Sequence, residues 1–137
     1  MRLAVDDRLG RVVAIKQLLT PVPASRARFE REARITARLE HPGVVPIYDR
    51  GVAEDGEPFY VMRRVAGHTL ADEIDRRTDL RERLRLIPIV QTVFDTLAYA
   101  HDQKIIHCDL KPTNVLVGGH GETLVIDWGL ADRKSVV

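Results

Sequence analysis

The 137 residues of this chain are enough for one domain with a hydrophobic core and too few for two sizeable domains. Its 21 Lys and Arg residues nearly balance 20 Asp and Glu residues, so the net charge of +1 gives no electrostatic indication of a nucleic-acid partner or an anionic membrane. The single cysteine, Cys108, excludes an internal disulfide and is typical of a reducing compartment. The longest uncharged apolar run, Leu86–Phe94, is too short to cross a bilayer, so we expect a cytoplasmic chain with no membrane segment.

The first half of the chain predicts a β-sheet with one helix. Three segments rich in Val, Ile and aromatic residues have the composition of strands. A helix is expected over Arg26–Leu39, with Ser25 as its N-cap and the His-Pro-Gly of residues 41–43 after its end. A turn at residues 54–57 precedes the last strand. The expected strands are Arg11–Leu18, Val44–Tyr48 and Phe59–Arg64.

The second half predicts helices followed by a hairpin. A short helix is expected over Leu70–Arg76 and a long one over about Leu80–His101, where apolar residues recur at a spacing of three to four. Pro88 falls inside the long helix and is expected to weaken or kink its first turns. Two short apolar segments, Val115–Val117 and Thr123–Ile126, flank a Gly-rich turn and predict a hairpin. This order of elements indicates an α+β fold class.

The clearest chemical signal lies between residues 105 and 129. Asp109, Lys111 and Asn114 place a carboxylate, an ammonium and an amide within six residues, and Asp127-Trp128-Gly129 follows at the end of an apolar strand. A base, a cation and two oxygen ligands for a hard metal are the groups that phosphoryl transfer needs, because that reaction depends mainly on positioning and charge neutralisation. A turn rich in Asp, Pro and Asn would explain residues 109–114 alone, but not the second motif at this distance.

This stretch resembles the eukaryotic-like (Hanks-type) protein kinases, whose catalytic loop reads His-Arg-Asp-Leu-x-x-x-Asn. The resemblance implies that Asp109 accepts or orients the substrate hydroxyl and that Lys111 neutralises the γ-phosphate. It also implies that Asn114 and Asp127 hold magnesium. The lysine two positions after the aspartate is similar to serine/threonine kinases rather than tyrosine kinases, and Cys108 stands where the family has an arginine.

Two further residues indicate the phosphate side of a nucleotide site. Val13-Ala14-Ile15-Lys16 resembles the kinase strand whose lysine holds the α- and β-phosphates, and the small Ala14 on the same face leaves room for a flat base. Glu32 lies in the apolar stripe of the helix Arg26–Leu39, where an unpaired carboxylate would be costly. We expect Glu32 to pair with Lys16, while an i,i+4 pair with Arg28 on a solvated face stays open.

The adenine side rests on the resemblance alone. The segment from Tyr60 to Val65 resembles the strand and hinge that bind adenine through backbone groups. The resemblance implies that Met62 is the gatekeeper, that Arg63 and Val65 offer the hinge carbonyl and amide, and that Leu116 lies under the base.

The resemblance covers nearly all of this chain and about half of a kinase domain. Residues 1–65 resemble the small lobe without its Gly-rich loop, and residues 66–137 resemble the start of the large lobe through Asp127-Trp128-Gly129. We therefore expect a bacterial serine/threonine protein kinase, truncated at both ends, that uses ATP and Mg²⁺ to phosphorylate a protein Ser or Thr and is weak or inactive as this chain. The alternatives are a non-catalytic nucleotide-binding or regulatory remnant, a gene fragment without separate function, and a small-molecule kinase similar to the aminoglycoside phosphotransferases.

The long helix carries a further expectation about partners. Kinases bury its apolar stripe against later helices, so we expect several large side chains of this stripe to be exposed here. Such a face is expected to weaken folding of the isolated chain and to offer a surface to another kinase chain.

Overall fold

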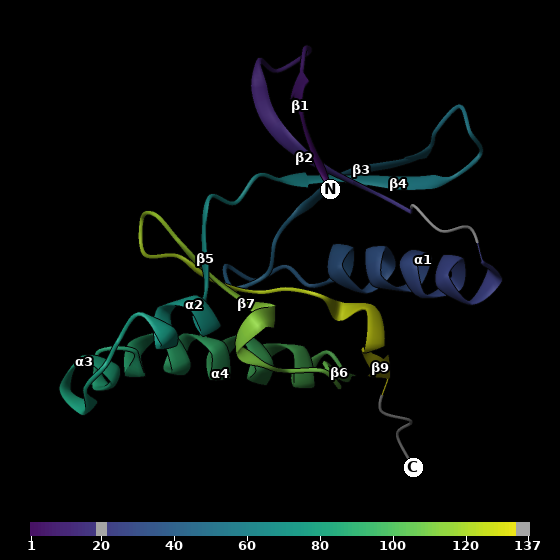
Figure 1. The fold of residues 1–137 in the computed structure, drawn as a ribbon. Helices are drawn as coiled ribbons and strands as arrows, with labels where there is room; N and C mark the ends of the chain where they lie inside the picture. Colours follow the sequence, from purple (N-terminus) through teal and green to yellow (C-terminus); the bar gives the residue numbers. More distant parts are fainter. Residues whose placement is uncertain (19–21, 134–137) are drawn as a thin grey trace.

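The computed structural model describes residues 1–18 and 22–133, and it consists of an antiparallel sheet and a mainly helical part with one helix between them (Figure 1). The four-stranded sheet has the order β1-β2-β4-β3, and each neighbouring pair is antiparallel. Its strands are β1 (Arg2–Asp6), β2 (Arg11–Gln17), β3 (Ile47–Val52) and β4 (Pro58–Arg63). The α+β class predicted from the sequence is confirmed.

The helix α1 (Pro23–Arg38) connects the two parts, because its apolar residues belong to two separate cores. Phe29 and Ala33 pack against Tyr60 of the sheet in a small core. Ile35 and, just after the helix, Leu39 belong to the main core of the second part. The position of α1 therefore fixes the sheet relative to the helical part.

The second part of the chain combines helices with short strands. The helices are α2 (Leu70–Asp75), α3 (Leu80–Leu84) and α4 (Ile87–Asp102). The strands β5 (Gly67–Thr69), β7 (Val115–Gly118) and β8 (Thr123–Val125) form one antiparallel sheet, and β6 (Ile105–Ile106) pairs with β9 (Asp132–Arg133). Two 3₁₀ turns cover Pro112–Asn114 and Trp128–Leu130. The hairpin of β7 and β8 confirms the predicted one.

Two boundaries in the first half differ from the prediction. The helix α1 starts at Pro23 and its N-cap is Val22, so the prediction of Ser25 as cap is wrong. Proline favours the first helical turn because its fixed φ is already helical and its missing N–H is not needed there. The strand predicted over Val44–Tyr48 instead begins at Ile47, since Val44 is buried in a turn whose contact is a parallel bridge to Val125.

The predicted long helix is two helices. The helix α3 ends at Leu84, and α4 begins at Ile87 with Pro88 in its first turn. A proline inside a continuous helix would leave one carbonyl unpaired and clash with the preceding turn, whereas in a first turn it costs nothing. The chain therefore breaks between the two helices at residues 85 and 86.

The apolar stripe of this region is divided between core and surface. Val93 is buried and Leu97 packs against the main core, but Ile87 is 49% exposed and Phe94 is 63% exposed. The prediction of exposed large apolar side chains on this helix is confirmed. Among the residues that the structure describes, every helix is too short or too polar to cross a membrane.

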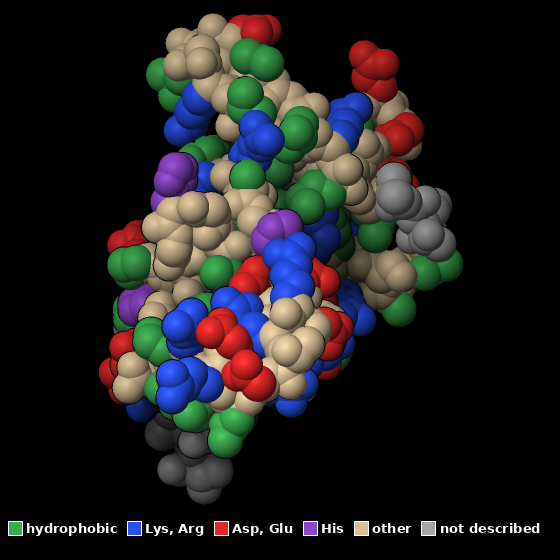
Figure 2. Space-filling model, turned by 60° about the vertical axis from the view of Figure 1, so that its left-hand side comes forward, with side chains coloured by type: hydrophobic (Ala, Val, Ile, Leu, Met, Phe, Trp, Pro, Cys, Tyr) green, Lys and Arg blue, Asp and Glu red, His purple; other side chains and the backbone are tan. Residues whose placement is uncertain are grey.

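The face that carries α2 and α3 shows Lys and Arg side chains lying beside Asp and Glu side chains (Figure 2). Glu73 lies 3.2 Å from Arg76 and 2.6 Å from Arg77, and Arg85 lies 3.0 Å from Glu82. Arg76, Glu82 and Arg85 are exposed, whereas Glu73 and Arg77 are partly buried. Exposed ion pairs contribute little to stability, and neighbouring charges of opposite sign are typical of a solvated surface rather than of a site for a polyanion.

Gly43 offers a test of how closely the turn after α1 packs on α4. A Cβ at this position would collide with Oγ1 of Thr96, which is fully buried. We expect Gly43→Ala to lower the free energy of unfolding by about 1–3 kcal/mol, the usual cost of overpacking. Urea denaturation measures the change, and Gly119→Ala is the matched control because its Cβ would meet only Ala66 O at 3.9 Å. Equal midpoints for the two variants would contradict this packing.

Candidate active site

A cleft of about 860 Å³ lies between the sheet and the second part of the chain. It is lined by residues of β2, α1, β4, the segment after β4, β7 and the segment after β8. Nine of the eleven site residues predicted from the sequence line it. They are Ala14, Lys16, Glu32, Met62, Arg63, Val65, Asn114, Leu116 and Asp127. A second groove of about 870 Å³, along α1 and residues 129–131, contains none of the predicted residues.

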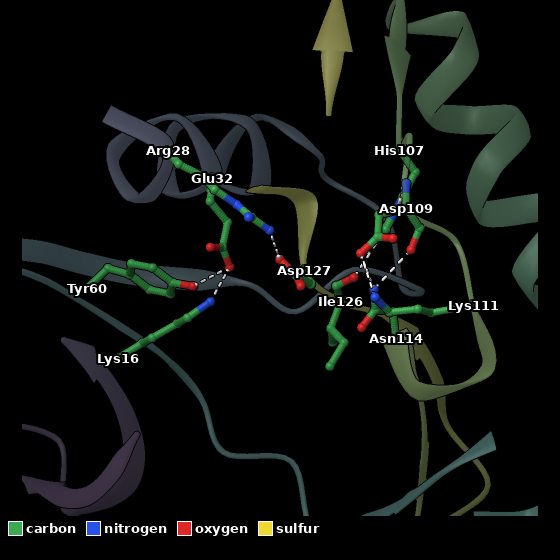
Figure 3. A network of polar contacts seen from close by, with 10 residues as sticks. All are labelled: Lys16, Arg28, Glu32, Tyr60, His107, Asp109, Lys111, Asn114, Ile126 and Asp127. Atoms are coloured by element: carbon green, nitrogen blue, oxygen red, sulfur yellow. Dashed lines mark hydrogen bonds and ion pairs between the residues drawn. The ribbon is translucent and has the colours of Figure 1, made fainter. Parts of the chain in front are cut away.

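Lys16 and Glu32 form the ion pair expected from the sequence (Figure 3). Nζ of Lys16 lies 2.6 Å from Oε1 of Glu32, and the glutamate is only 7% exposed. The hydroxyl of Tyr60 donates a second hydrogen bond to the same oxygen at 2.8 Å. The buried carboxylate therefore receives two donors from the sheet, as a charge in an apolar helix face requires.

The alternative partner of Glu32, Arg28, turns to a different carboxylate. Nη2 of Arg28 lies 3.9 Å from Oδ1 of Asp127. Both side chains are substantially exposed, so this pair is worth less than about 1 kcal/mol. Positions 28 and 32 share one face of α1, and the helix thus reaches both ends of the candidate site.

Asp127 has an unusual backbone conformation. Its φ of 61° and ψ of 64° lie in the left-handed region, which aspartate tolerates better than most residues. Gly129 follows against α1, where a Cβ would lie 3.0 Å from Nε of Arg28 and 3.2 Å from Oδ1 of Asp127. A Cβ there would make tight contacts with these side chains, so the glycine leaves room for them beside the backbone of this segment.

His107 links the loop of Asp109 to the segment of Asp127. Its Nε2 lies 2.9 Å from the carbonyl oxygen of Ile126, and its Nδ1 accepts the backbone N–H of Asp109 at 3.3 Å. These partners require a neutral ring with the proton on Nε2. The ring is buried and packs on Trp128 with 4.6 Å between the centroids, so His107 belongs to the core beneath the loop of Asp109.

Asp109 and Lys111 do not line the cleft but adjoin it through Asn114. Nζ of Lys111 lies 2.8 Å from Oδ2 of Asp109, and Nδ2 of Asn114 donates to the carbonyl oxygen and to Oδ2 of Asp109 at 2.9 and 3.2 Å (Figure 3). The hydrogen bond from Lys111, followed by its charge and by Asn114, lowers the pKa of Asp109 below the ordinary value. Asp109 is therefore a carboxylate at neutral pH.

The predicted adenine-side residues come from opposite walls of the cleft. Ala14 and Met62 are cross-strand partners in the sheet, and Leu116 belongs to β7 in the second part. Arg63 and Val65 lie at and just after the end of β4. Ala14, Met62, Val65 and Leu116 give this end of the cleft apolar surface, and Arg63 lies beside them.

Sequence reasoning missed Tyr60 as a residue of this site. The signal was present, because Tyr60 precedes Met62 by two positions in a predicted strand and so shares its face. Its hydroxyl on a buried face needs a partner, and Glu32 was the one carboxylate already predicted to be buried there.

Comparison with known proteins agrees with this geometry. A family model described as the protein kinase domain matches residues 1–135. The chain belongs to the protein kinase family. It is 37% identical over 145 residues to the serine/threonine-protein kinase PknD of Protochlamydia amoebophila, a match that covers 94% of this chain and 14% of that protein.

Other relatives give the same result. PknD of Chlamydia muridarum is 36% identical over 149 residues, with 96% of this chain and 15% of the relative covered. The probable serine/threonine-protein kinase SCO3848 of Streptomyces coelicolor is 37% identical over 134 residues, with 93% and 20% covered. The chain thus spans between 14% and 20% of the length of these relatives. Protein kinases as a family use ATP and Mg²⁺.

The titration of Tyr60 tests the buried side of this candidate site. Burial, followed by the charge of Glu32 and the hydrogen bond to it, raises the pKa of Tyr60 far above the ordinary value of about 10. The unfolded chain loses this proton above pH 10 while the folded chain keeps it, so the contribution to stability is complete below pH 10 and falls as the pH rises further.

We expect the folded chain and its Tyr60→Phe variant to gain the same tyrosinate absorbance up to a pH of about 11. In urea at that pH, the unmutated chain should gain one tyrosinate more than the variant. Ultraviolet titration measures both. An extra tyrosinate in the folded, unmutated chain below this pH would show that the hydroxyl is not buried against Glu32.

Proposed function

We propose that this chain binds ATP with Mg²⁺ and belongs to a serine/threonine protein kinase that transfers the γ-phosphoryl group to a protein hydroxyl. The proposal divides the chain into a small-lobe part, residues 1–65, and the start of a large lobe, residues 66–137. The observation that supports it best is that Lys16, Asn114 and Asp127, which are distant in sequence, line one cleft. A turn or a solvated surface would not require this convergence.

The donor atoms fit a magnesium ion. Asn114 is 7% exposed and directs its amide nitrogen to Asp109, which leaves its oxygen for the cleft. Asp127 offers carboxylate oxygens in the same cleft. Two oxygen donors suit Mg²⁺, which is usually bound by one or two protein groups together with phosphates and water. When bound, this ion neutralises the charge that develops on the phosphates.

The remaining charged residues have separate roles in the proposal. Lys16 binds the α- and β-phosphates, and Glu32 fixes its ammonium. Asp109 accepts or orients the substrate hydroxyl, because both of its side-chain contacts go to Oδ2 and leave Oδ1 as an acceptor. Lys111, 2.8 Å from that carboxylate, supplies the cation for the transferred phosphate. These four groups position reactants and balance charge, which is most of what phosphoryl transfer asks of a protein.

The adenine contacts are assigned from the lining of the cleft, and the phosphate acceptor from the motif around Asp109. Ala14, Met62 and Leu116 would contact adenine, and Arg63 and Val65 would offer it backbone groups. A Ser or Thr acceptor is supported by Lys111 two positions after Asp109, and the names of the relatives agree with it. The substrate is therefore a protein with an exposed Ser or Thr.

Thermal unfolding tests the nucleotide site. Because a ligand that binds only the folded state stabilises it by RT ln(1 + [L]/Kd), Mg-ATP at about 100 times its Kd should add about 2.7 kcal/mol and raise the Tm by several degrees. We expect Asp127→Ala or removal of Mg²⁺ with EDTA to abolish most of this shift. Asp95→Ala, an exposed acid on α4, is the control and should keep it. An equal shift in all variants would refute magnesium binding at Asp127.

Asp109→Asn separates binding from transfer. Asp109 lies outside the cleft lining, so this variant should keep the Mg-ATP shift in Tm. Transfer of labelled phosphate to casein, measured at the same fraction folded, should fall by a factor of about 10²–10⁴, the usual contribution of an acid–base group. Transfer that survives the substitution unchanged would remove Asp109 from the reaction.

A further inference from the structure

Three side chains from three elements meet at one buried oxygen. Lys16 and Tyr60 are direct cross-strand partners in β2 and β4, and both reach across to Glu32 of α1. Their donor atoms lie 2.6 and 2.8 Å from the same Oε1. The ammonium of Lys16 also lies 5.8 Å from the centroid of the Tyr60 ring, within the range of a cation–π contact.

Tyr60 is the best fixed of the three. It is 3% exposed, whereas the side chain of Lys16 is 34% exposed and opens to the cleft. Its ring packs on Phe29, one turn before Glu32 on α1, with 5.1 Å between the centroids. Tyr60 therefore contacts α1 twice, through its ring and through its hydroxyl, and its position is set by core packing rather than by solvent.

The direction of the two hydrogen bonds to Glu32 determines how the carboxylate is held. A carboxylate only accepts, and a lysine ammonium only donates, so the tyrosine hydroxyl must donate its proton to Glu32. If Lys16 were the only donor, the carboxylate of Glu32 could rotate together with the lysine, because both side chains have several rotatable bonds. A second donor from the buried side restricts the carboxylate to one orientation.

We propose that Tyr60 is a positioning residue that holds Glu32 toward Lys16 and so fixes the Lys16 ammonium in the cleft before a nucleotide binds. Its importance for nucleotide affinity rests on the proposed function, but its effect on Lys16 does not. The raised pKa of Tyr60 supports the proposal, because the hydroxyl stays protonated and remains a donor over the working pH range. Such preorganisation reduces the ordering cost of binding.

The reactivity of Lys16 toward an amine-specific acylating reagent tests the proposal without a nucleotide. The rate at Lys16 relative to the exposed Lys104, read by mass spectrometry, reports how often the ammonium leaves Glu32. We expect Tyr60→Phe to raise this ratio about fivefold, the factor that corresponds to one typical hydrogen bond. An unchanged ratio would overturn the proposal.

The control removes a hydroxyl elsewhere in the fold. Tyr99 accepts the backbone N–H of Glu40 at 3.0 Å, outside the cleft lining. Tyr99→Phe is therefore the same chemical change at a second hydrogen-bonded tyrosine, and it should leave the ratio unchanged. A rise in Tyr99→Phe equal to that in Tyr60→Phe would assign the effect to general loosening and overturn the proposal.

A double-mutant cycle tests whether Tyr60 acts through Glu32. Glu32→Gln should raise the reactivity of Lys16 by itself, and Tyr60→Phe should then add little. A further rise of the same size in the Glu32→Gln background would show that Tyr60 acts on Lys16 directly through its ring, against the proposal. Tyr60→Phe keeps the contact with Phe29, and circular dichroism checks that each variant is folded.

One measurement needs no substitution. The hydroxyl proton of Tyr60 should give a slowly exchanging NMR signal in the unmutated chain, since it is buried and donated. A hydroxyl in fast exchange with solvent would overturn the proposal even if Tyr60→Phe did not fold.

The effect of Mg-ATP on the acylation of Lys16 shows whether the role of Tyr60 or the proposed function fails. Mg-ATP should slow acylation of Lys16 in the unmutated chain, and Tyr60→Phe should need about fivefold more of it for the same protection. If Mg-ATP gives no protection at all, the proposed function fails while the nucleotide-free ratio still decides the role of Tyr60. Protection at equal concentrations in both proteins would overturn the role of Tyr60 in affinity.

Discussion

The buried carboxylate of Glu32 is the constraint on which the arrangement of this chain depends. A charge in the apolar face of a helix is tolerated only where donors meet it, and here both donors come from neighbouring strands of the sheet. This requirement orients α1 about its own axis. The same orientation directs Arg28 to Asp127 and places Phe29 on Tyr60. The two hydrogen bonds to Glu32 thus set the packing of the helix against the sheet and the shape of the cleft.

The second part of the molecule packs against this helix through a glycine and is held together by a buried histidine and tryptophan. Gly129 lets the backbone pass close to Arg28 and Glu32, and His107 joins the segments that carry Asp109 and Asp127 through its two ring nitrogens. Trp128 covers that histidine from inside the core. The segments that carry Asp109 and Asp127 are therefore held by buried contacts, while the carboxylates of these two residues are partly exposed. This division is expected of a site whose chemistry depends on positioning.

Sequence patterns predicted much of this, and the reasons for the failures are physical. The motif residues could be found because their chemistry requires particular side chains at particular spacings. The Lys16–Glu32 contact could be predicted because burying the carboxylate of Glu32 without a cationic partner would be costly. The start of α1 and the break before α4 depend on where Pro23 and Pro88 fall within a turn, which periodicity does not show. Val44 was wrongly assigned to a strand because a buried apolar residue in a turn gives the same sequence signal as a buried residue in a strand. Tyr60 was missed because its hydroxyl was not matched with Glu32, although its position two residues before Met62 places both side chains on one face of the strand.

Mapping a bound nucleotide by NMR tests the central claim most directly. A non-hydrolysable ATP analogue with Mg²⁺ should shift the amide signals of β2, of residues 63–66 and of residues 125–129, which surround the cleft on both sides. The exposed face of α3 and the start of α4 should not respond. Shifts confined to that face or to the groove along α1, or no shifts at millimolar analogue, would contradict a nucleotide site in this cleft.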